Sequence, residues 1–141
     1  RQEAGLTDHV IGFCGELEAG MAGLSREEQQ EFLESLAMAE PAFMRIIQAA
    51  FHLLGRITYF TVGEDEVKAW VIPRGAKAPR AAAVIHKDFE RGFIKAEVVS
   101  YDDFIACGGT LAAAKAAGKL RLEGKEYVVE DGDIISFRFN V

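Results

Sequence analysis

The spacing of apolar and polar residues changes along the chain. In the first part apolar residues recur every three or four positions, as in helices, whereas from Thr58 onward several stretches alternate between apolar and polar residues, as in strands. We therefore expect a helix-rich first part over residues 1–57 and a separate domain over residues 58–141. The acidic, glycine-containing residues 61–66 are the expected boundary loop.

The first part is predicted to contain one strand and two helices. Residues 9–14, HVIGFC, form a short apolar run with a central glycine, which is typical of a buried strand. Ser25 and Glu28 have the spacing of a capping box and predict a helix over residues 26–36. Pro41 suits the first position of a second helix, which the glycine after residue 54 ends.

The second predicted helix has an unusually wide apolar stripe. Its members follow the i, i+3, i+4, i+7, i+8 spacing and are Phe43, Ile46, Ile47, Ala50, Phe51 and Leu54. One short strand and one short helix cannot cover so much apolar surface. We therefore expect residues 1–57 to pack against something outside this chain.

The second part has the pattern of an α+β domain with a mixed sheet. Strands are predicted over residues 66–72, 93–99, 119–123, 126–129 and 134–139, and helical segments over residues 78–86, 101–105 and 111–117. Gly124 and Lys125 are expected to form a two-residue hairpin turn. In residues 93–99 the predicted core face is Ile94, Ala96 and Val98, whereas either face of residues 134–139 could be buried.

Composition limits the class of protein. The 141 residues suit one ordinary domain, or one small domain with a helical appendage, and no apolar stretch has the length of a membrane helix. The start of the chain has no basic segment followed by an apolar one, so we expect no signal peptide. Cys14 and Cys107 lie far apart and have no metal-ligand spacing, which favours two small, buried apolar side chains in a reducing, cytoplasmic protein.

Positive charge is concentrated in one segment of a chain whose net charge is −6. Residues 74–95 contain only two acids, Asp88 and Glu90, but six bases: Arg74, Lys77, Arg80, Lys87, Arg91 and Lys95. The first five bases are candidates for contact with the phosphates of RNA, without readout of base sequence. The alternative is a solvated surface whose charge is cancelled by neighbouring acids.

Three other groups of residues could carry chemistry. His86, Asp88 and Glu90 could form an acid–base pair or a metal site, but their place at a predicted helix end favours a charged connection or a contact surface. Asp131 and Asp133 flank Gly132, and turns favour this composition without any catalytic role. The single tryptophan, Trp70, is interpreted as a core residue rather than as a platform for base stacking.

A long motif resembles a known family. The stretch ITYFTVGEDEVKAWVIPRGAKAPRAAAVIHKDFERGFIKAEVVSYDDF, together with LRLEGKEYVVEDGDIISFRFNV, resembles the C-terminal TGS domain of the YchF/Obg-like ATPase family. The resemblance extends over residues 57–141, about 60% of the chain. The TGS domain of that family resembles the ubiquitin-like β-grasp fold, so the resemblance implies this fold for residues 58–141.

The resemblance also implies a role for the first part. Residues 1–57 look like the end of the family's P-loop NTPase domain, and Cys14 and Gly15 would then lie near the nucleotide base. The chain has Cys14-Gly15-Glu16 where the family usually has Ser-Ala-Lys or a similar triplet. For the whole parent protein, the resemblance implies an ATP-preferring, GTP-tolerant hydrolase that uses Mg and binds the ribosome.

The phosphate-binding motif GxxxxGK[ST] is absent from the 141 residues. We therefore expect no catalytic residue, metal ligand or cofactor in this chain, and ATP (or GTP) with Mg in the parent protein. The expected function is a cytoplasmic binding or regulatory module for the ribosome or ribosomal RNA, with the missing P-loop domain as an intramolecular partner and no membrane contact. The alternative is a structural or protein-docking domain without nucleic-acid contact.

Overall fold

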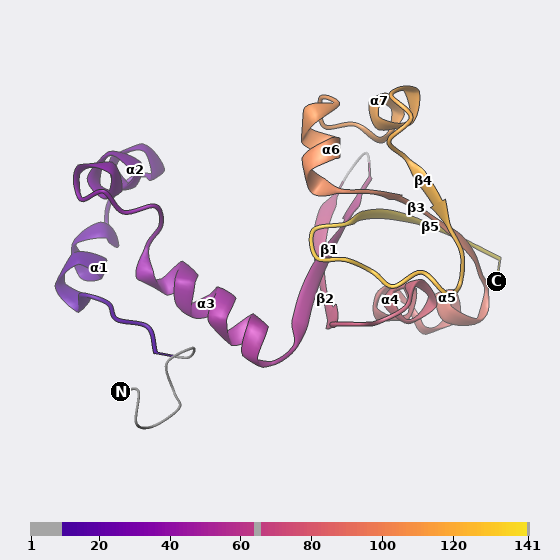
Figure 1. The fold of residues 1–141 in the computed structure, drawn as a ribbon, viewed down its shortest axis with the longest axis horizontal. Coiled ribbons are helices and arrows are strands. Elements are labelled where there is room, and N and C mark those ends of the chain that lie inside the picture. Colours follow the sequence, from indigo (N-terminus) through magenta and orange to yellow (C-terminus); the bar gives the residue numbers. More distant parts are fainter. Residues whose placement is uncertain (1–9, 64–65, 141) are drawn as a thin grey trace. The chain divides into compact units, whose positions relative to one another are not determined.

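The computed structural model describes residues 10–63 and 66–140. The chain divides after Leu54 into two compact units. Figure 1 shows the first unit as helices in indigo to magenta, and the second as a sheet with helices.

The first unit consists of α1 (Gly15–Met21), α2 (Arg26–Ser35) and α3 (Ala42–Leu53). The predicted capping box at the start of α2 is confirmed. Ser25 Oγ accepts a hydrogen bond from the backbone N–H of Glu28 at 3.3 Å, and the Glu28 carboxylate accepts one from the backbone N–H of Ser25 at 2.8 Å. These contacts hold the pKa of Glu28 below its usual value.

The strand predicted over residues 9–14 is wrong for the part that the structure describes. Residues 10–14 have no regular structure, and residue 9 lies outside the described residues. A strand needs a neighbouring strand to pair its backbone, and residues 10–54 contain none. The sequence also missed α1, because Cys14 makes no side-chain cap and so no start signal precedes the helix.

The apolar stripe of α3 is largely uncovered within its own unit. Phe43 is 52% exposed, Ile47 48% and Leu54 70%, whereas Ala42 is the one buried residue of the helix. The backbone N–H of Ala42 donates to the Glu18 carboxylate at 2.8 Å, which joins the start of α3 to α1. The stripe therefore remains available for packing against another structure.

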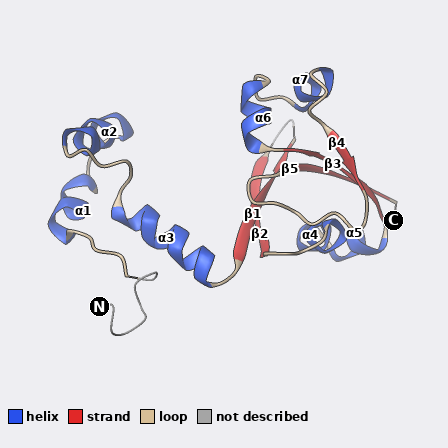
Figure 2. Ribbon diagram, in the orientation of Figure 1, coloured by secondary structure: helices blue, strands red, loops and turns tan. Residues whose placement is uncertain are grey.

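The second unit is built on a five-stranded sheet in the order β2-β1-β5-β3-β4. The strands are β1 (Arg56–Val62), β2 (Val67–Pro73), β3 (Phe93–Val99), β4 (Arg121–Glu123) and β5 (Ile134–Phe139). Strand β1 pairs in parallel with β5, and the other neighbours are antiparallel (Figure 2). The α+β prediction with a mixed sheet is confirmed.

Helices α4 (Ala78–Ile85) and α5 (Lys87–Arg91) cover one face of this sheet. Ala78, Ala81 and Ala82 are fully buried, since their small side chains let α4 lie close to the strands. Tyr59 and Ile72 lie beneath them and are also fully buried. This is the main core of the unit.

Helices α6 (Tyr101–Ala106) and α7 (Leu111–Ala116) cover part of the opposite face. Their core is smaller and contains Val99, Phe104, Ala114 and Ile134. Thr110 caps α7, because its Oγ1 accepts a hydrogen bond from the backbone N–H of Ala113 at 3.1 Å.

The sequence missed β1 and misplaced the boundary. Residues 61 and 62 of the expected boundary loop instead belong to β1 and pair with β2, and residues 64–65 lie outside the described part. The stretch RITYFTV is rich in β-branched and aromatic residues and was the available signal for a strand.

The hairpin predicted over residues 119–129 is also wrong. Residues 126–129 do not pair with β4; instead Val128 forms an isolated bridge with Lys77, and the backbone N–H of Val129 donates to the carbonyl of Ala76 at 3.0 Å. Gly124 belongs to a local turn, accepting from the backbone N–H of Tyr127 at 3.2 Å. Contact with the segment before α4 therefore overrides the local hairpin pattern.

The core face of β3 was predicted correctly for Ala96 and Val98 but not for Ile94. A register irregularity between Phe93 and Lys95 interrupts the alternation, so Phe93 is buried and Ile94 is 56% exposed.

Replacing Tyr59 by phenylalanine should destabilise the chain by about 1 kcal/mol, because the buried hydroxyl would no longer donate to the carbonyl of Ala81 at 3.0 Å. Chemical denaturation of the wild type and Y59F measures the effect. Tyr101, which is 52% exposed, supplies the control Y101F. An equal loss in both variants would contradict a role for the buried hydrogen bond.

Candidate functional site

The five predicted contact residues lie together in the layer of α4 and α5. Arg74 is in the turn after β2, Lys77 is the N-cap of α4, Arg80 is on α4, and Lys87 and Arg91 are on α5. All five are exposed. We call these five residues the basic surface.

The packing of α4 explains why its cations face solvent. Ala78, Ala81 and Ala82 occupy the buried side of the helix. Arg80 lies on the opposite, exposed side of the helix, and Lys77 is exposed at the N-cap.

Only part of this positive charge is neutralised locally. Lys77 pairs with Glu126, and Arg91 lies 3.3 Å from Asp88. Arg74, Arg80 and Lys87 have no carboxylate within 4.0 Å among residues 10–63 and 66–140. Exposed ion pairs are weak, so the basic surface can exchange them for contacts with another anion.

His86 joins two helices rather than forming a catalytic pair. It ends α4 and caps α5, where its Nδ1 accepts a hydrogen bond from the backbone N–H of Asp88 at 3.3 Å. Nδ1 is 3.7 Å from the Asp88 carboxylate, and both side chains are about half exposed. This arrangement agrees with the interpretation of His86 as part of a charged connection at a helix end. Within the described part of the chain, no three His, Cys, Asp or Glu side chains converge as metal ligands.

Cys14 and Gly15 lie at the start of α1. Cys14 is an exposed free thiol, which differs from the predicted small buried side chain, and Gly15 is the first residue of the helix. The proximity of these residues to a nucleotide base stays a prediction.

Trp70 packs against the main core, as predicted. It is half-buried, and its indole N–H donates to Thr61 Oγ1 at 2.9 Å. The ammonium of Lys68 lies 4.5 Å from the centre of the ring.

The Asp131–Asp133 turn has the structural role that its composition suggests. Asp131 Oδ1 accepts a hydrogen bond from the backbone N–H of Thr58 at 2.7 Å, which ties the turn to β1. Asp133 is buried, with 2% of its surface exposed, and accepts hydrogen bonds from the Tyr127 hydroxyl at 2.7 Å and the Glu130 backbone N–H at 2.9 Å. Arg121 donates in turn to the Tyr127 hydroxyl at 2.9 Å.

Burial controls the proton equilibria in this network. It raises the pKa of Asp133 above its usual value, although the hydrogen bonds from Glu130 and Tyr127 act in the opposite direction. Burial also raises the pKa of Tyr127, with a further contribution from its hydrogen bond to Asp133.

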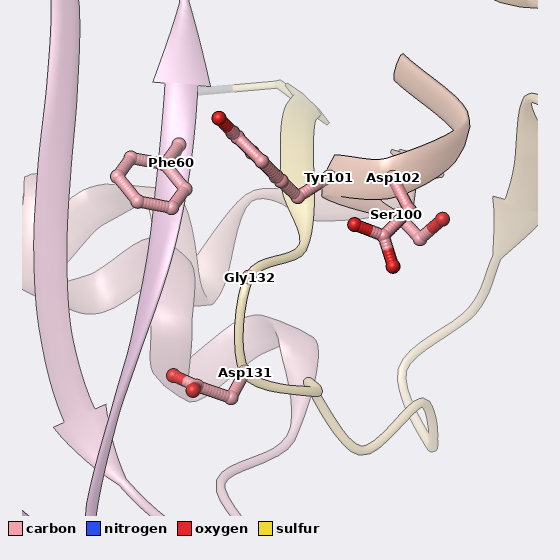
Figure 3. A pocket seen from close by; sticks show the side chains of 6 residues that line it. All are labelled: Phe60, Ser100, Tyr101, Asp102, Asp131 and Gly132. Atoms are coloured by element: carbon pink, nitrogen blue, oxygen red, sulfur yellow. The ribbon is translucent and has the colours of Figure 1, made fainter. Parts of the chain in front are cut away.

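A depression that was not predicted lies on the face of the sheet away from α4. It has a volume of about 490 Å³ and is lined by Phe60, Ser100, Tyr101, Asp102, Asp131 and Gly132 (Figure 3). No sequence pattern could identify it, because the lining comes from three distant segments. Within residues 10–63 and 66–140, no helix has the length and apolar character needed to cross a membrane.

The pH dependence of stability should change in the Asp133→Asn variant. The folded chain binds the Asp133 proton more tightly than the unfolded chain, whose carboxyl titrates near 3.8. Protonation of Asp133 therefore favours the folded chain. This contribution to the free energy of unfolding is present below pH 3.8, and it is lost as the pH rises through the raised pKa of Asp133 in the folded chain. From pH 3.8 upward, the free energy of unfolding of the wild type relative to that of D133N should thus fall as the pH rises. Chemical denaturation of both proteins at a series of pH values measures this difference.

The hydrogen bonds that Asp133 accepts lower its pKa and so act against the effect of burial. If the stability of the wild type relative to D133N rises with pH, those bonds outweigh burial and the predicted sign is wrong.

Comparisons with known proteins agree with the arrangement of the second unit. The family YchF-GTPase_C, described as "Protein of unknown function (DUF933)", matches residues 56–140. The chain is 56% identical over 138 residues to the "Ribosome-binding ATPase YchF" of Bacillus subtilis, covering 98% of this chain and 37% of that protein. It is 53% identical over 131 residues to "Obg-like ATPase 1" of Gallus gallus, covering 93% and 33%, respectively.

A solved structure shows the same similarity. The structure of the Schizosaccharomyces pombe YchF GTPase matches with a TM-score of 0.72 and 41% identity, covering 84% of this chain and 31% of that chain. This chain therefore spans about a third of the length of the relatives it matches. It belongs to the YchF-GTPase_C family and is homologous to the C-terminal part of the YchF/Obg-like ATPases.

Proposed function

We propose that this chain is a binding and regulatory module of a YchF-type ATPase and that its basic surface contacts ribosomal RNA. The observation that carries the proposal is the exposed layer of α4 and α5, in which Arg74, Arg80 and Lys87 have no nearby carboxylate within the described ranges. The names of relatives such as the Bacillus subtilis ribosome-binding ATPase support the same kind of partner.

The chemistry of these side chains suits phosphate. A guanidinium group can donate two parallel hydrogen bonds to phosphate oxygens, and a lysine ammonium acts as a compact positive charge. Such contacts release counterions from the nucleic acid, so binding should weaken as salt is added. They position the protein without selecting a base sequence.

We assign nucleotide hydrolysis to the rest of the parent protein. Residues 1–57 would be the end of a P-loop NTPase domain and residues 58–141 its TGS domain. ATP, or GTP as a second substrate, would bind with Mg in the missing domain, with Cys14 and Gly15 near the base. The exposed stripe of α3 supports this division, because the missing domain would cover it. The proposed setting is the cytoplasm, where ribosomes lie.

A second candidate function is protein docking without RNA contact. The observation in its favour is the exposed edge strand β2, where Val67 and Val71 are 67% and 45% exposed. Ribosome co-sedimentation distinguishes this role from RNA contact.

Removing three cations from the basic surface should weaken ribosome binding and reduce its dependence on salt. In the full-length protein we expect R74Q/R80Q/K87Q to reduce the slope of log binding constant against log salt concentration by about 2, since each phosphate contact contributes roughly 0.7 to 0.9. The measurement is co-sedimentation with ribosomal subunits over a range of salt concentrations.

A matched variant controls for net charge. K95Q/K115Q/K119Q also removes three exposed lysine charges, from β3, α7 and the segment after α7. It should leave the slope close to that of the wild type. Equal affinity and equal slope in the wild type and the basic-surface variant would refute the proposed contact.

The 141-residue chain alone should not hydrolyse ATP, whereas the full-length protein should. The reason is that the chain lacks the backbone cradle and lysine that hold the β- and γ-phosphates. Release of inorganic phosphate from ATP measures both. Turnover by the 141-residue chain at the rate of the full-length protein would show that the hydrolytic site lies within it.

A further inference from the structure

The sheet of the second unit has an open apolar strip on the face away from α4. Neighbouring residues of a strand point to opposite faces, and Tyr59 is buried beneath α4, so Phe60 points to the other face. Val67, Ala69 and Val71 on β2 share that face and are exposed. Ala69 lies directly opposite Phe60 in the register, and the strip therefore runs from Phe60 to the edge of the sheet.

The depression described above adjoins this strip at Phe60. Figure 3 shows Tyr101 extending from the start of α6 toward Phe60. The centres of the two rings are 6.4 Å apart, and Tyr101 is 52% exposed. Gly132 leaves the space beside Tyr101 open, because a Cβ at this position would lie 3.6 Å from the Tyr101 Cβ.

Two carboxylates give this aromatic depression a negative charge. Asp102 and Asp131 both line it and are both exposed. In the described part of the chain, neither lies within 4.0 Å of a lysine, arginine or histidine nitrogen. Asp131 is held in place by its hydrogen bond from the backbone N–H of Thr58, but its second oxygen makes no hydrogen bond to a described residue.

The combination of aromatic rings and carboxylates matches one side chain better than others. An arginine guanidinium stacks on aromatic rings through its plane and donates hydrogen bonds to carboxylates along its edge. Apolar residues beside the arginine could pack on Ala69 and Val71. RNA is excluded by charge, because its phosphates would meet two carboxylates.

We propose that this face of the sheet docks a segment of a partner protein in which an arginine has apolar neighbours. The arginine lies against Tyr101 and Phe60 and pairs with Asp102 or Asp131. The neighbouring apolar side chains cover the strip on β2. This contact lies on the opposite face from the basic surface, so it goes beyond the proposed RNA contact and does not depend on it.

A short peptide can test the docking site on the 141-residue chain. The probe is acetyl-Val-Arg-Val-amide, and its neutral counterpart carries citrulline in place of arginine. We expect the arginine peptide to shift the backbone NMR signals of Tyr101, Asp102 and Gly132. Citrulline keeps the shape of arginine but removes its charge. The dissociation constant of the citrulline peptide should therefore be about tenfold higher than that of the arginine peptide.

Matched variants separate the two carboxylates from general negative charge. D102N/D131N keeps the side-chain shape and an oxygen that can accept from Thr58, and it should raise the dissociation constant of the arginine peptide by about tenfold. E27Q/E31Q removes two exposed charges from α2 and should leave binding unchanged. Dispersed NMR spectra confirm that each variant is folded. Y101L tests independently the stacking of the peptide's arginine on the Tyr101 ring.

Any one of four results with the peptides and variants would overturn the proposal. They are equal binding of the citrulline peptide, equal weakening by E27Q/E31Q, perturbation confined to α2, and unchanged binding in both D102N/D131N and Y101L. Self-association of the free chain that D102N/D131N abolishes would instead identify this face as an interface between copies and would also overturn the partner proposal.

Discussion

The close approach of α4 to the sheet is the constraint on which the second unit depends. Ala78, Ala81 and Ala82 have no exposed surface, and larger side chains at these positions would push the helix away from Tyr59 and Ile72. The same packing decides which residues face solvent. Because the alanines occupy the inner side of α4, Arg80 lies on its outer side and forms part of the basic surface.

The turn before β5 connects this core to the other face of the sheet. The backbone N–H of Phe60 donates to the carbonyl of Asp133 at 2.8 Å, and Asp131 accepts from Thr58 on the same strand. These bonds bring the turn beside β1 although the two are distant in sequence. They also place Asp131 and Phe60 at the depression that Tyr101 borders. One domain thus presents positive charge on its helical layer and a negatively charged aromatic depression on its opposite face.

The first unit has a different balance between local and tertiary interactions. Its helices have local signals, such as the capping box of Ser25, but α3 keeps most of its large apolar residues exposed. Burial of apolar surface is the main favourable term in folding, so this unit gains little stability from its own core. A structure outside the chain would supply the missing burial.

Local sequence signals determined the helix ends at Ser25, His86 and Thr110, the chemistry of the Asp131–Asp133 turn, and the concentration of charge from Arg74 to Arg91. These features depend on residues only a few positions apart, which backbone geometry and capping bring together whatever the rest of the chain does. The order of predicted elements indicated the α+β class, and the family motif agreed with it. Tertiary structure alone decided the pairing of β1 with β5, the burial of Phe93 in place of Ile94, and the bridge between Lys77 and Val128. It also decided the meeting of Phe60, Tyr101 and Asp131. Each joins segments distant in sequence or depends on a local break in strand register, and no local pattern encodes which distant partner satisfies a backbone group.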